Sequence, residues 1–335
     1  MKGLVVGCGS IGHRHLRNLK SLGVSDLGFV ESDRERRESA ASELGVASFA
    51  LLTEGLRWTP DFVLIATPTH LHIEQAIEVA THGCAFFVEK PLSHTPEGIA
   101  ELLNAIQRHG LISMVGCNMR FHPAPRKIKE LLDQRRLGKL LCARIHSGFY
   151  LPAWRPGTDY RMNYAAREET GGGCILDCIH EIDLARWYLG DVVDVFCAAG
   201  HLSSLEIATE DVAVLVSRHA SGVLSEVHLD YVQRSYERGC QIAGEDGSLS
   251  WDFREKQVRW YDAVSDHWET FEQPADWQLN QMYIDEMRHF LDCVQERKET
   301  MLPVADAARV MEFVFAAKQS ASERRVITLN WDVTA

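Results

Sequence analysis

Three closely spaced glycines near the N-terminus constrain the fold of this chain more than any other feature. Gly7, Gly9 and Gly12 follow an apolar run and precede an amphipathic segment, in the spacing GxGxxG. A second apolar run ends at Glu31, 19 residues after Gly12. A strand, a glycine turn, a helix and an acidic residue at the end of the next strand form the dinucleotide-binding fingerprint. The alternative is a strand-to-helix turn without a ligand.

The residues of this motif have distinct roles in binding a dinucleotide. Gly7 permits the tight turn, Gly9 lets the backbone approach the pyrophosphate, and Gly12 allows close packing of the helix. Ser10 and Ile11 lie at the predicted helix start, where free N–H groups and the positive end of the dipole face the phosphates.

The second strand predicts which dinucleotide is bound. Glu31 is expected to accept a hydrogen bond from the adenosine ribose and to repel a 2′-phosphate, which favours NAD. Ser32 and Arg34 could bind such a phosphate, so NADP is the alternative cofactor. His13 and His15 are two residues apart and do not share a helix face. We therefore expect them at the surface or at the edge of the cofactor rather than in a metal site.

The first third of the chain alternates short apolar runs with amphipathic segments. This alternation is typical of βαβ units and predicts a doubly wound parallel sheet, the Rossmann arrangement. The predicted strands are Leu4–Gly7, Leu27–Glu31, Phe62–Thr67, Ala85–Glu89 and Ile112–Asn118, and the predicted helices are His13–Leu22, Arg34–Leu44, Leu71–His82 and Pro96–His109.

The pattern changes after residue 121 and predicts a second, α+β domain with an open, largely antiparallel sheet. We therefore predict a nucleotide-binding domain over 1–121 and a substrate-binding and oligomerisation domain over 122–335. A helix is expected from near Gly173 to Leu189, and the sequence EDGS at Glu245–Ser248 is typical of a hairpin turn. The other predicted strands are Leu140–Phe149, Val192–Ala199, Val212–Arg218, Gly222–Val232, Cys240–Ala243, Ser248–Phe253 and Gln257–Tyr261, and the other predicted helices are Pro125–Arg136, Trp277–Arg297 and Val304–Ser322.

Charge and cysteine content narrow the possible partners. The formal net charge of −12 argues against general binding of nucleic acid or of an anionic membrane. Nine cysteines without CxxC pairs indicate free thiols and a reducing cytoplasm, and Cys174 and Cys178 are expected to be buried. No signal peptide and no apolar stretch of membrane-spanning length is apparent in the sequence.

Two polar sequences end neighbouring strands of the predicted parallel sheet. Thr67 and Pro68 end one strand, and Glu89, Lys90 and Pro91 end the next. Doubly wound proteins place their ligands at this carboxyl edge. Lys90 is therefore predicted to lie beside the nicotinamide, although a solvated lysine at a strand end is the alternative. The bond between Lys90 and Pro91 is a candidate for the cis form.

A helix in the second domain carries a candidate acid/base pair. Asp177 and His180 are three residues apart, so a continuous helix would place them on one face. Histidine exchanges protons near neutral pH, and a neighbouring carboxylate can orient it. One alternative is a helix-start acid with a buried structural histidine, and another is a metal site that also includes Asp183. No metal is expected, because no other residues show ligand spacing.

The loop YLPAWRPGTDYRMNY is the predicted reader of the substrate. Trp154, Tyr160 and Tyr164 could stack on a sugar face, and Arg155 and Arg161 could bind a carboxylate or a phosphate. A surface loop with solvated arginines is the alternative.

Taken in order, GxGxxG, ATPTHLH, EKP, NMRFHP, the segment GGGCILDCIHEID and LPVADAARVMEFVFAAKQSA resemble the glucose–fructose oxidoreductase / inositol dehydrogenase family. The resemblance covers nearly the whole chain and implies NAD(P)-dependent oxidation of a sugar-type substrate. It departs in the spacing of Asp177 and His180, which is three rather than four, and in Thr69, where asparagine is common. The resemblance implies catalytic roles for Lys90, Asp177 and His180, cofactor contacts for Pro68, His72, Glu89, Lys90 and Asn118 as well as Thr67, and a substrate contact for Arg120.

Three functions remain open from the sequence. The leading hypothesis is an NAD(P)-dependent oxidoreductase that acts on a secondary hydroxyl or ketone of a sugar, sugar acid or sugar nucleotide, with an association to surface-glycan synthesis. The alternatives are a transient-redox enzyme for glycoside cleavage or epimerisation without net cofactor turnover, and a non-catalytic sugar or NAD sensor. The resemblance also implies a homo-oligomer, a dimer or a tetramer.

Overall fold

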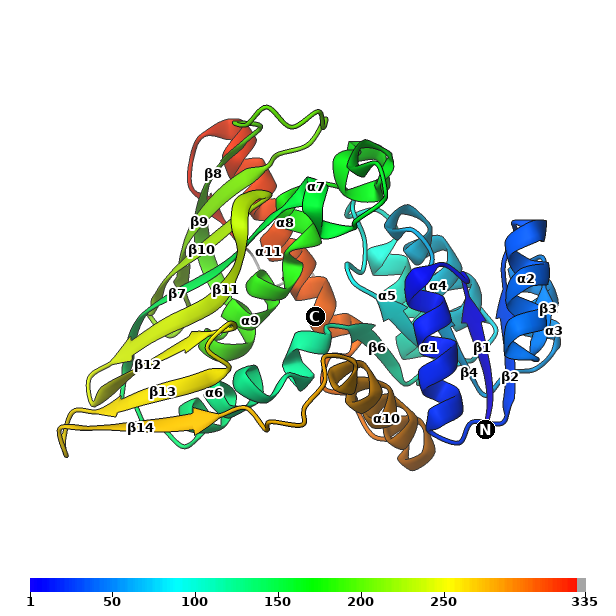
Figure 1. Cartoon of the computed structure of the whole chain (residues 1–335), viewed down its shortest axis with the longest axis horizontal. Helices are drawn as coiled ribbons and strands as arrows, with labels where there is room; N and C mark the ends of the chain where they lie inside the picture. Colours follow the sequence, from blue (N-terminus) through cyan, green and yellow to red (C-terminus); the bar gives the residue numbers. More distant parts are fainter. Residues whose placement is uncertain (330–335) are drawn as a thin grey trace. The chain divides into compact units, whose positions relative to one another are not determined.

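A computed structural model describes residues 1–329 (Figure 1). Contacts between residues divide this part of the chain into two compact units. The first unit contains residues 1–118 and 278–308, and the second contains residues 119–277 and 309–329. The segment 278–308 thus packs with the N-terminal residues. The domain boundary that we place after residue 121 stays a prediction.

The first unit is built on a parallel sheet. Its elements are β1 (Lys2–Val6), α1 (Ser10–Ser21), β2 (Asp26–Val30), α2 (Arg34–Leu44), β3 (Ala47–Phe49), α3 (Leu52–Arg57), β4 (Phe62–Ile65), η1 (Thr69–Leu71), α4 (His72–Thr81), β5 (Ala85–Glu89), α5 (Ile99–His109), β6 (Ser113–Gly116) and α10 (Asn280–Glu296). The strands lie in the order β3-β2-β1-β4-β5-β6. This order is that of the Rossmann fold, so the predicted doubly wound sheet is confirmed.

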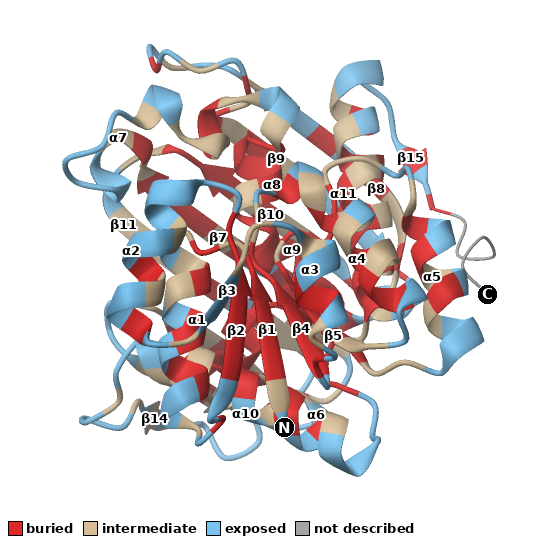
Figure 2. Ribbon diagram, turned by 90° about the vertical axis from the view of Figure 1, so that its right-hand side faces the viewer, coloured by how far each residue is buried: buried red, intermediate tan, exposed pale blue. Residues whose placement is uncertain are grey.

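Burial explains why the central strands are continuous apolar runs. The strands β1, β4 and β5 are almost entirely buried, as expected for a parallel sheet that helices cover on both faces (Figure 2). Phe290 of α10 packs edge-on against Phe62 and Phe87, with ring centroids 5.8 Å apart in each pair. The helix α10 also packs against α1, so a segment from late in the chain completes the first unit.

The second unit is built on a mixed sheet. Its strands are β7 (Leu140–Tyr150), β8 (Val192–Gly200), β9 (Val212–His219), β10 (Leu224–Asp230), β11 (Val232–Gly244), β12 (Gly247–Asp252), β13 (Gln257–Asp262), β14 (His267–Glu272) and β15 (Ile327–Thr328). They lie in the order β14-β13-β12-β11-β7-β10-β9-β8-β15. Only the β7–β10 pair is parallel among its described pairings, so the predicted open, largely antiparallel sheet is confirmed.

Helices cover one face of this sheet. The other elements of the chain are η2 (Asn118–Phe121), α6 (Pro123–Asp133), α7 (Leu151–Trp154), η3 (Tyr160–Met162), η4 (Tyr164–Ala166), η5 (Glu168–Thr170), α8 (Cys174–Asp177), α9 (Ile179–Leu189) and α11 (Val304–Glu323). The helix α6 contacts β13, and α9 contacts β7. Burial alternates along β9, as expected when one face packs on helices and the other does not.

One of the helices predicted from the sequence is wrong. The predicted helix from Gly173 to Leu189 is two helices, because Cys178 leaves helical geometry with φ −90° and ψ 30°. Asp177 ends α8 and His180 lies in the first turn of α9, so the shared helix face that we inferred for them does not exist.

Two other expectations concern thiols and membrane helices. Cys174 and Cys178 are buried, as predicted. No helix within residues 1–329 is long and apolar enough to cross a membrane.

Candidate active-site residues in the two units

The glycine turn of the first unit has the geometry of a phosphate cradle. Gly7 has a φ of +89°, which L side chains rarely adopt, and a Cβ at Gly12 would collide with the carbonyl oxygen of Gly7. A Cβ at Gly9 would meet no atom within 4 Å, so the backbone there is open to a ligand. Gly9 caps α1, whose first residues are Ser10 and Ile11. The N–H groups of this helix start are therefore available to a pyrophosphate.

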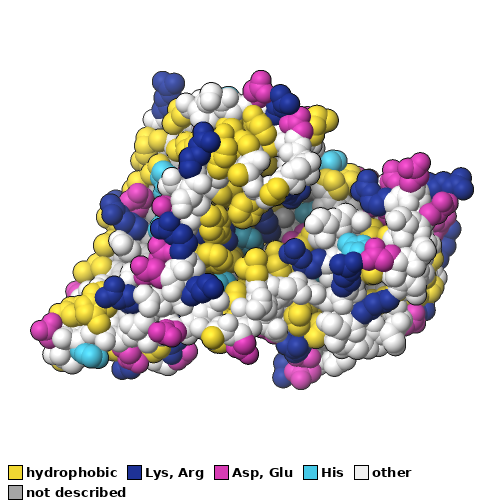
Figure 3. All heavy atoms as spheres, in the orientation of Figure 1, with side chains coloured by type: hydrophobic (Ala, Val, Ile, Leu, Met, Phe, Trp, Pro, Cys, Tyr) yellow, Lys and Arg dark blue, Asp and Glu magenta, His cyan; other side chains and the backbone are white. Residues whose placement is uncertain are grey.

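A cavity of about 900 Å³ adjoins this turn. Basic side chains gather on this side of the first unit (Figure 3). An anionic ligand is the chemistry that such a lining favours. The lining residues are Cys8, Gly9, Ser10, His13, Arg14, Arg17, Asn18, Arg36 and Asn280. Arg14, which lies 4.6 Å from the ring centroid of Tyr283, is a candidate phosphate contact that our sequence reasoning missed.

Glu31 is held next to the glycine turn. Its side chain follows β2, is buried, and accepts hydrogen bonds from the backbone N–H groups of Cys8 (3.2 Å) and Asp33 (3.0 Å). Arg36 approaches it at 3.6 Å, whereas the Arg34 side chain is turned to the surface. The carboxylate is thus fixed beside the glycine turn, and its contact with the ribose stays a prediction.

Replacing Glu31 by glutamine tests this assignment. The change removes the charge but keeps the shape and an acceptor for the ribose. We expect the ratio of kcat/KM with NADP to kcat/KM with NAD to rise by about tenfold or more, because a like-charge contact costs several kcal/mol. Steady-state kinetics with both cofactors measure this ratio. An unchanged ratio would mean that Glu31 does not face the 2′-position.

The carboxyl edge of the sheet carries the other predicted residues of the first unit. Lys90 is half-buried, and the peptide bond between Lys90 and Pro91 is cis. The Oγ1 atom of Thr67 donates to Gln75 at 2.6 Å, and Pro68 caps η1.

Three further predicted residues at this edge are buried. Asn118 lies at the start of η2. Glu89 directly precedes Lys90 in the sequence, and His72 lies close to it in space. His72 contacts the carbonyl group of Pro91, and Glu89 contacts the backbone N–H of Lys90. The predicted cofactor residues of the first unit thus gather at the ends of neighbouring strands.

In the second unit, two tyrosines hold the carboxylate of Asp177. Tyr164 donates to Oδ1 at 2.6 Å, and Tyr231 approaches Oδ2 at 3.4 Å. Burial, followed by the charge of Asp177, raises the pKa of Tyr231 well above its usual value, so its hydroxyl stays a donor. Tyr164 was predicted as a stacking residue, and the structure gives it a polar contact that the sequence pattern does not reveal.

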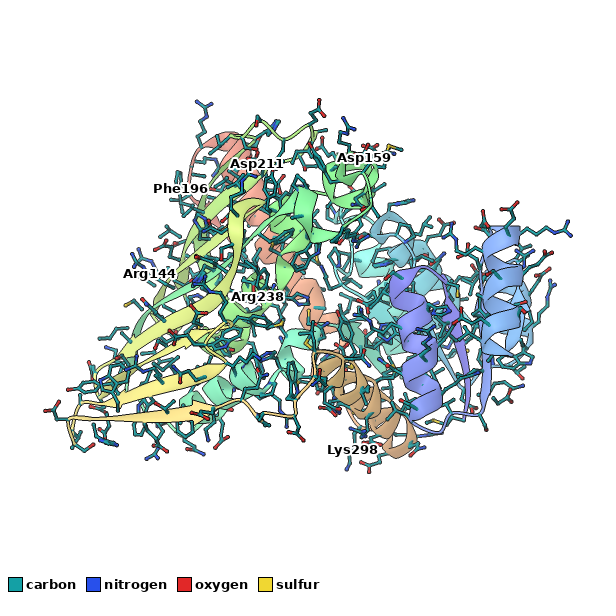
Figure 4. The ribbon with its side chains drawn as sticks, in the orientation of Figure 1. Arg144, Asp159, Phe196, Asp211, Arg238 and Lys298 are labelled. Carbon is teal, nitrogen blue, oxygen red and sulfur yellow. The ribbon has the colours of Figure 1, made fainter. Side chains whose placement is uncertain are left out.

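His180 lies on a helix that two buried ion pairs hold in place. Arg120 of η2 binds Asp183 through Nε at 2.8 Å and Nη2 at 2.7 Å, and both side chains are almost fully buried. Arg238 of β11, which lies on the helix-covered side of the sheet in Figure 4, approaches Glu181 at 2.7 Å. His180 directly precedes Glu181 and lies three residues before Asp183. The two ion pairs therefore hold the turn of α9 that carries His180.

The pairing of Arg120 bears on its predicted role. We predicted a substrate contact for this residue, but its guanidinium binds the buried Asp183 and lies 5.2 Å from the ring centroid of Trp187. The substrate contact stays a prediction without support from this geometry. Asp183 was also part of the alternative metal site, and no group of three metal-binding side chains is found within residues 1–329.

The two arginines predicted to bind the substrate, both in the loop over residues 150–172, differ in their charge partners. Arg161 binds both oxygens of Asp159 and also Glu206, so its charge is already compensated. Arg155 has no carboxylate partner in the described part of the chain, and its guanidinium lies 5.5 Å from the ring centroid of Tyr164.

The two other aromatic residues predicted to face the substrate already have partners in the second unit. Trp154 stacks on Tyr236 at a centroid distance of 5.6 Å. The hydroxyl of Tyr160 accepts from the backbone N–H of Glu206 at 3.1 Å. Their stacking on a sugar stays a prediction.

A Rossmann sheet with a phosphate cradle and a fixed acidic residue after β2 defines a dinucleotide-binding oxidoreductase fold. Comparison with known families agrees with this class. Residues 1–117 match the oxidoreductase family with an NAD-binding Rossmann fold, and residues 126–250 match the GFO/IDH/MocA C-terminal domain. The chain belongs to the GFO/IDH/MocA family and its first domain binds NAD, which confirms the resemblance seen in the sequence.

Several characterised relatives align over most of the chain. Myo-inositol 2-dehydrogenase of Thermotoga maritima is 29% identical, with 97% of each chain covered. Inositol 2-dehydrogenase 2 of Saccharopolyspora erythraea is 30% identical, with 73% of this chain and 71% of the relative covered. Levoglucosan dehydrogenase in complex with NADH has the same fold, with a TM-score of 0.90 at 20% identity and coverage of 98% and 99%. The chain is thus an oxidoreductase of a family that acts on sugars and polyols.

Proposed function

We propose that this protein is an NAD-dependent dehydrogenase that oxidises a secondary hydroxyl of a sugar, a polyol, a sugar acid or a sugar nucleotide. The observation that carries the proposal is the position of Lys90, half-buried at the carboxyl edge of the NAD-binding sheet between two anchored neighbours. The names of the relatives, which include inositol, apiose and levoglucosan dehydrogenases, support this class of substrate.

The proposed reaction removes a hydride and a proton from one carbinol group. When bound, NAD supplies the acceptor for the hydride that leaves the carbinol carbon. The C–H bond breaks, the carbon–oxygen bond becomes a carbonyl, and the hydroxyl proton passes to a basic group of the protein. We propose Lys90 and His180 for this proton transfer, with Asp177 as a carboxylate that orients the reacting groups.

The charge of Arg155 is evidence for a substrate that carries an anionic group. Its charge lacks a carboxylate partner within residues 1–329, while the neighbouring Arg161 is compensated by Asp159 and Glu206. A guanidinium binds carboxylate and phosphate groups through paired hydrogen bonds. This favours a sugar acid or a sugar nucleotide. A structural neighbour, the WlbA dehydrogenase of Bordetella pertussis, was solved with NADH and UDP-GlcNAcA. We include a role in surface-glycan synthesis in the proposal.

A panel of sugars, polyols, sugar acids and sugar nucleotides tests the function. Formation of reduced nicotinamide is followed by fluorescence with NAD and with NADP. We expect one class of compound to produce a signal that depends on its concentration. If NAD binds but the whole panel stays silent, net dehydrogenation is rejected, and product analysis then decides between the transient-redox alternative and a non-catalytic sensor.

The outer face of the second sheet supports a homo-oligomer, a dimer or a tetramer. Phe196 of β8 and Val216 of β9 are paired across the strands and are 41% and 49% exposed, and Leu224 of β10 is 50% exposed. Burial of these side chains against a second copy would remove apolar surface from water. Light scattering should give a mass of two or four chains, and Val216→Lys should lower it. A monomer at every concentration would contradict this assignment.

A further inference from the structure

Two buried histidines contact the residues on either side of Lys90. His15 lies in α1 and His72 begins α4, and their exposed fractions are 0% and 1%. His15 reaches Glu89, the residue before Lys90, and His72 reaches Pro91, the residue after it. The proposed reaction uses neither imidazole, so their burial at this turn requires another explanation.

The contact of His15 with Glu89 is short and has a defined direction. Nε2 of His15 lies 2.5 Å from Oε1 of Glu89. Nδ1 of His15 is buried and has no hydrogen-bond partner within residues 1–329, and a carboxylate oxygen accepts, so Nε2 is the donor to Glu89. The other oxygen of Glu89 accepts from the backbone N–H of Lys90 at 3.3 Å. His15 therefore orients a carboxylate that in turn holds the backbone of Lys90.

His72 connects the ends of two neighbouring strands. Its Nδ1 lies 2.8 Å from the carbonyl oxygen of Pro91, and its Nε2 lies 2.9 Å from that of Thr67. Carbonyl oxygens only accept, so a neutral ring can donate to one of them and a protonated ring to both. Burial lowers the pKa of His72, and the two carbonyl groups act in the opposite direction. Only a protonated ring donates to both carbonyl groups; a neutral ring donates to one of them and lies in contact with the other, between the segment after β5 and the segment after β4.

We propose that His15 and His72 are positioning residues that hold Lys90 in the geometry needed for proton transfer. The inference rests on the proposed function, because it assigns these residues to the proton-transfer step of Lys90. A displacement of about 1 Å can cost 10²-fold in rate when the reacting groups must be aligned. Neither histidine needs to touch the substrate for this role.

The test measures whether the two histidines act through Lys90. His15→Phe removes the donor and keeps a ring among Phe87 and Tyr283, and His72→Leu removes both contacts. We expect each change to lower kcat by about tenfold or more, and the Kd of NAD to change by less than about threefold. In a Lys90→Ala background, the same changes should cause no further loss.

Conservative variants and a matched control separate positioning from stability. His15→Gln keeps one donor for Glu89 and should restore most of the rate, which also covers the case in which His15→Phe does not fold. His82→Asn changes an exposed histidine at the end of α4 whose ring contacts the carbonyl group of Glu78, and it should retain the full rate.

The outcomes distinguish this inference from the proposed function. Folded His15→Phe and His72→Leu proteins with a kcat within about twofold of the wild type would overturn it. Losses that multiply with that of Lys90→Ala would overturn it as well. Near-normal turnover of Lys90→Ala would instead reject the proposed role of Lys90 and the inference with it.

Discussion

Replacing Lys90 by alanine is expected to lower kcat by about 10²–10⁴-fold, the range typical of a group that transfers a proton in the transition state. The residue is half-buried at the end of β5, so the truncation leaves no large cavity in the core. The protein should therefore fold normally and still bind NAD. Steady-state kinetics with the substrate found in the panel, together with a thermal unfolding curve, measure both properties.

An exposed lysine provides the control for the loss of charge. Lys298 lies beyond the end of α10 and binds Glu296 on the surface, with 71% of its side chain exposed (Figure 4). Lys298→Ala removes the same charge and should leave kcat unchanged. Equal activities of the two variants would mean that Lys90 is a solvated lysine at a strand end, the alternative that the sequence left open.

Removal of Asp183 is expected to destabilise the protein by about 3–5 kcal/mol, because it leaves the charge of Arg120 buried without its carboxylate. The two side chains are 2% and 1% exposed and form two hydrogen bonds of 2.7–2.8 Å. We expect this loss for Asp183→Ala in urea unfolding. The double variant Arg120→Met/Asp183→Leu should recover much of it, since apolar residues of similar volume can replace a buried ion pair.

A surface ion pair is the control for this prediction. Arg34 and Glu38 form an exposed pair on α2, and Glu38→Ala should leave the urea midpoint nearly unchanged, because water screens such a pair. A shift for Asp183→Ala no greater than that of the surface variant would mean that water reaches Arg120. The role of this pair in fixing the start of α9 would then be lost.

Local sequence patterns predicted most of the longer helices and strands. They could not predict contacts between residues that are far apart in the sequence. The glycine spacing and the apolar runs around it were sufficient for the Rossmann sheet, because a buried parallel strand is recognisable from its own residues. His15 was expected at the surface or at the edge of the cofactor and is instead fully buried against Glu89, 74 residues away. The partners Arg120 and Asp183 are 63 residues apart, and nothing in either segment indicates the other.

The break between α8 and α9 has a similar cause. The segment from Cys174 to Leu189 is buried on nearly every side, its charged residues included, so it has no amphipathic periodicity that would reveal where one helix ends. The prediction missed β3 and α3, because elements this short contain too few residues to show a hydrophobic periodicity. Asp177 could be proposed from its motif, but its two tyrosine partners depend on the path of the chain.

The most direct test of the central claim is a single-turnover measurement with enzyme and NAD in stoichiometric amounts and the best substrate of the panel. Absorbance of reduced nicotinamide is followed in a stopped-flow instrument for the wild type and for Lys90→Ala. The account predicts a rise in the wild type that persists at the end of the reaction and is slowed by at least about 10²-fold in the variant. No rise with NAD bound, or a rise of equal rate in both proteins, would contradict it.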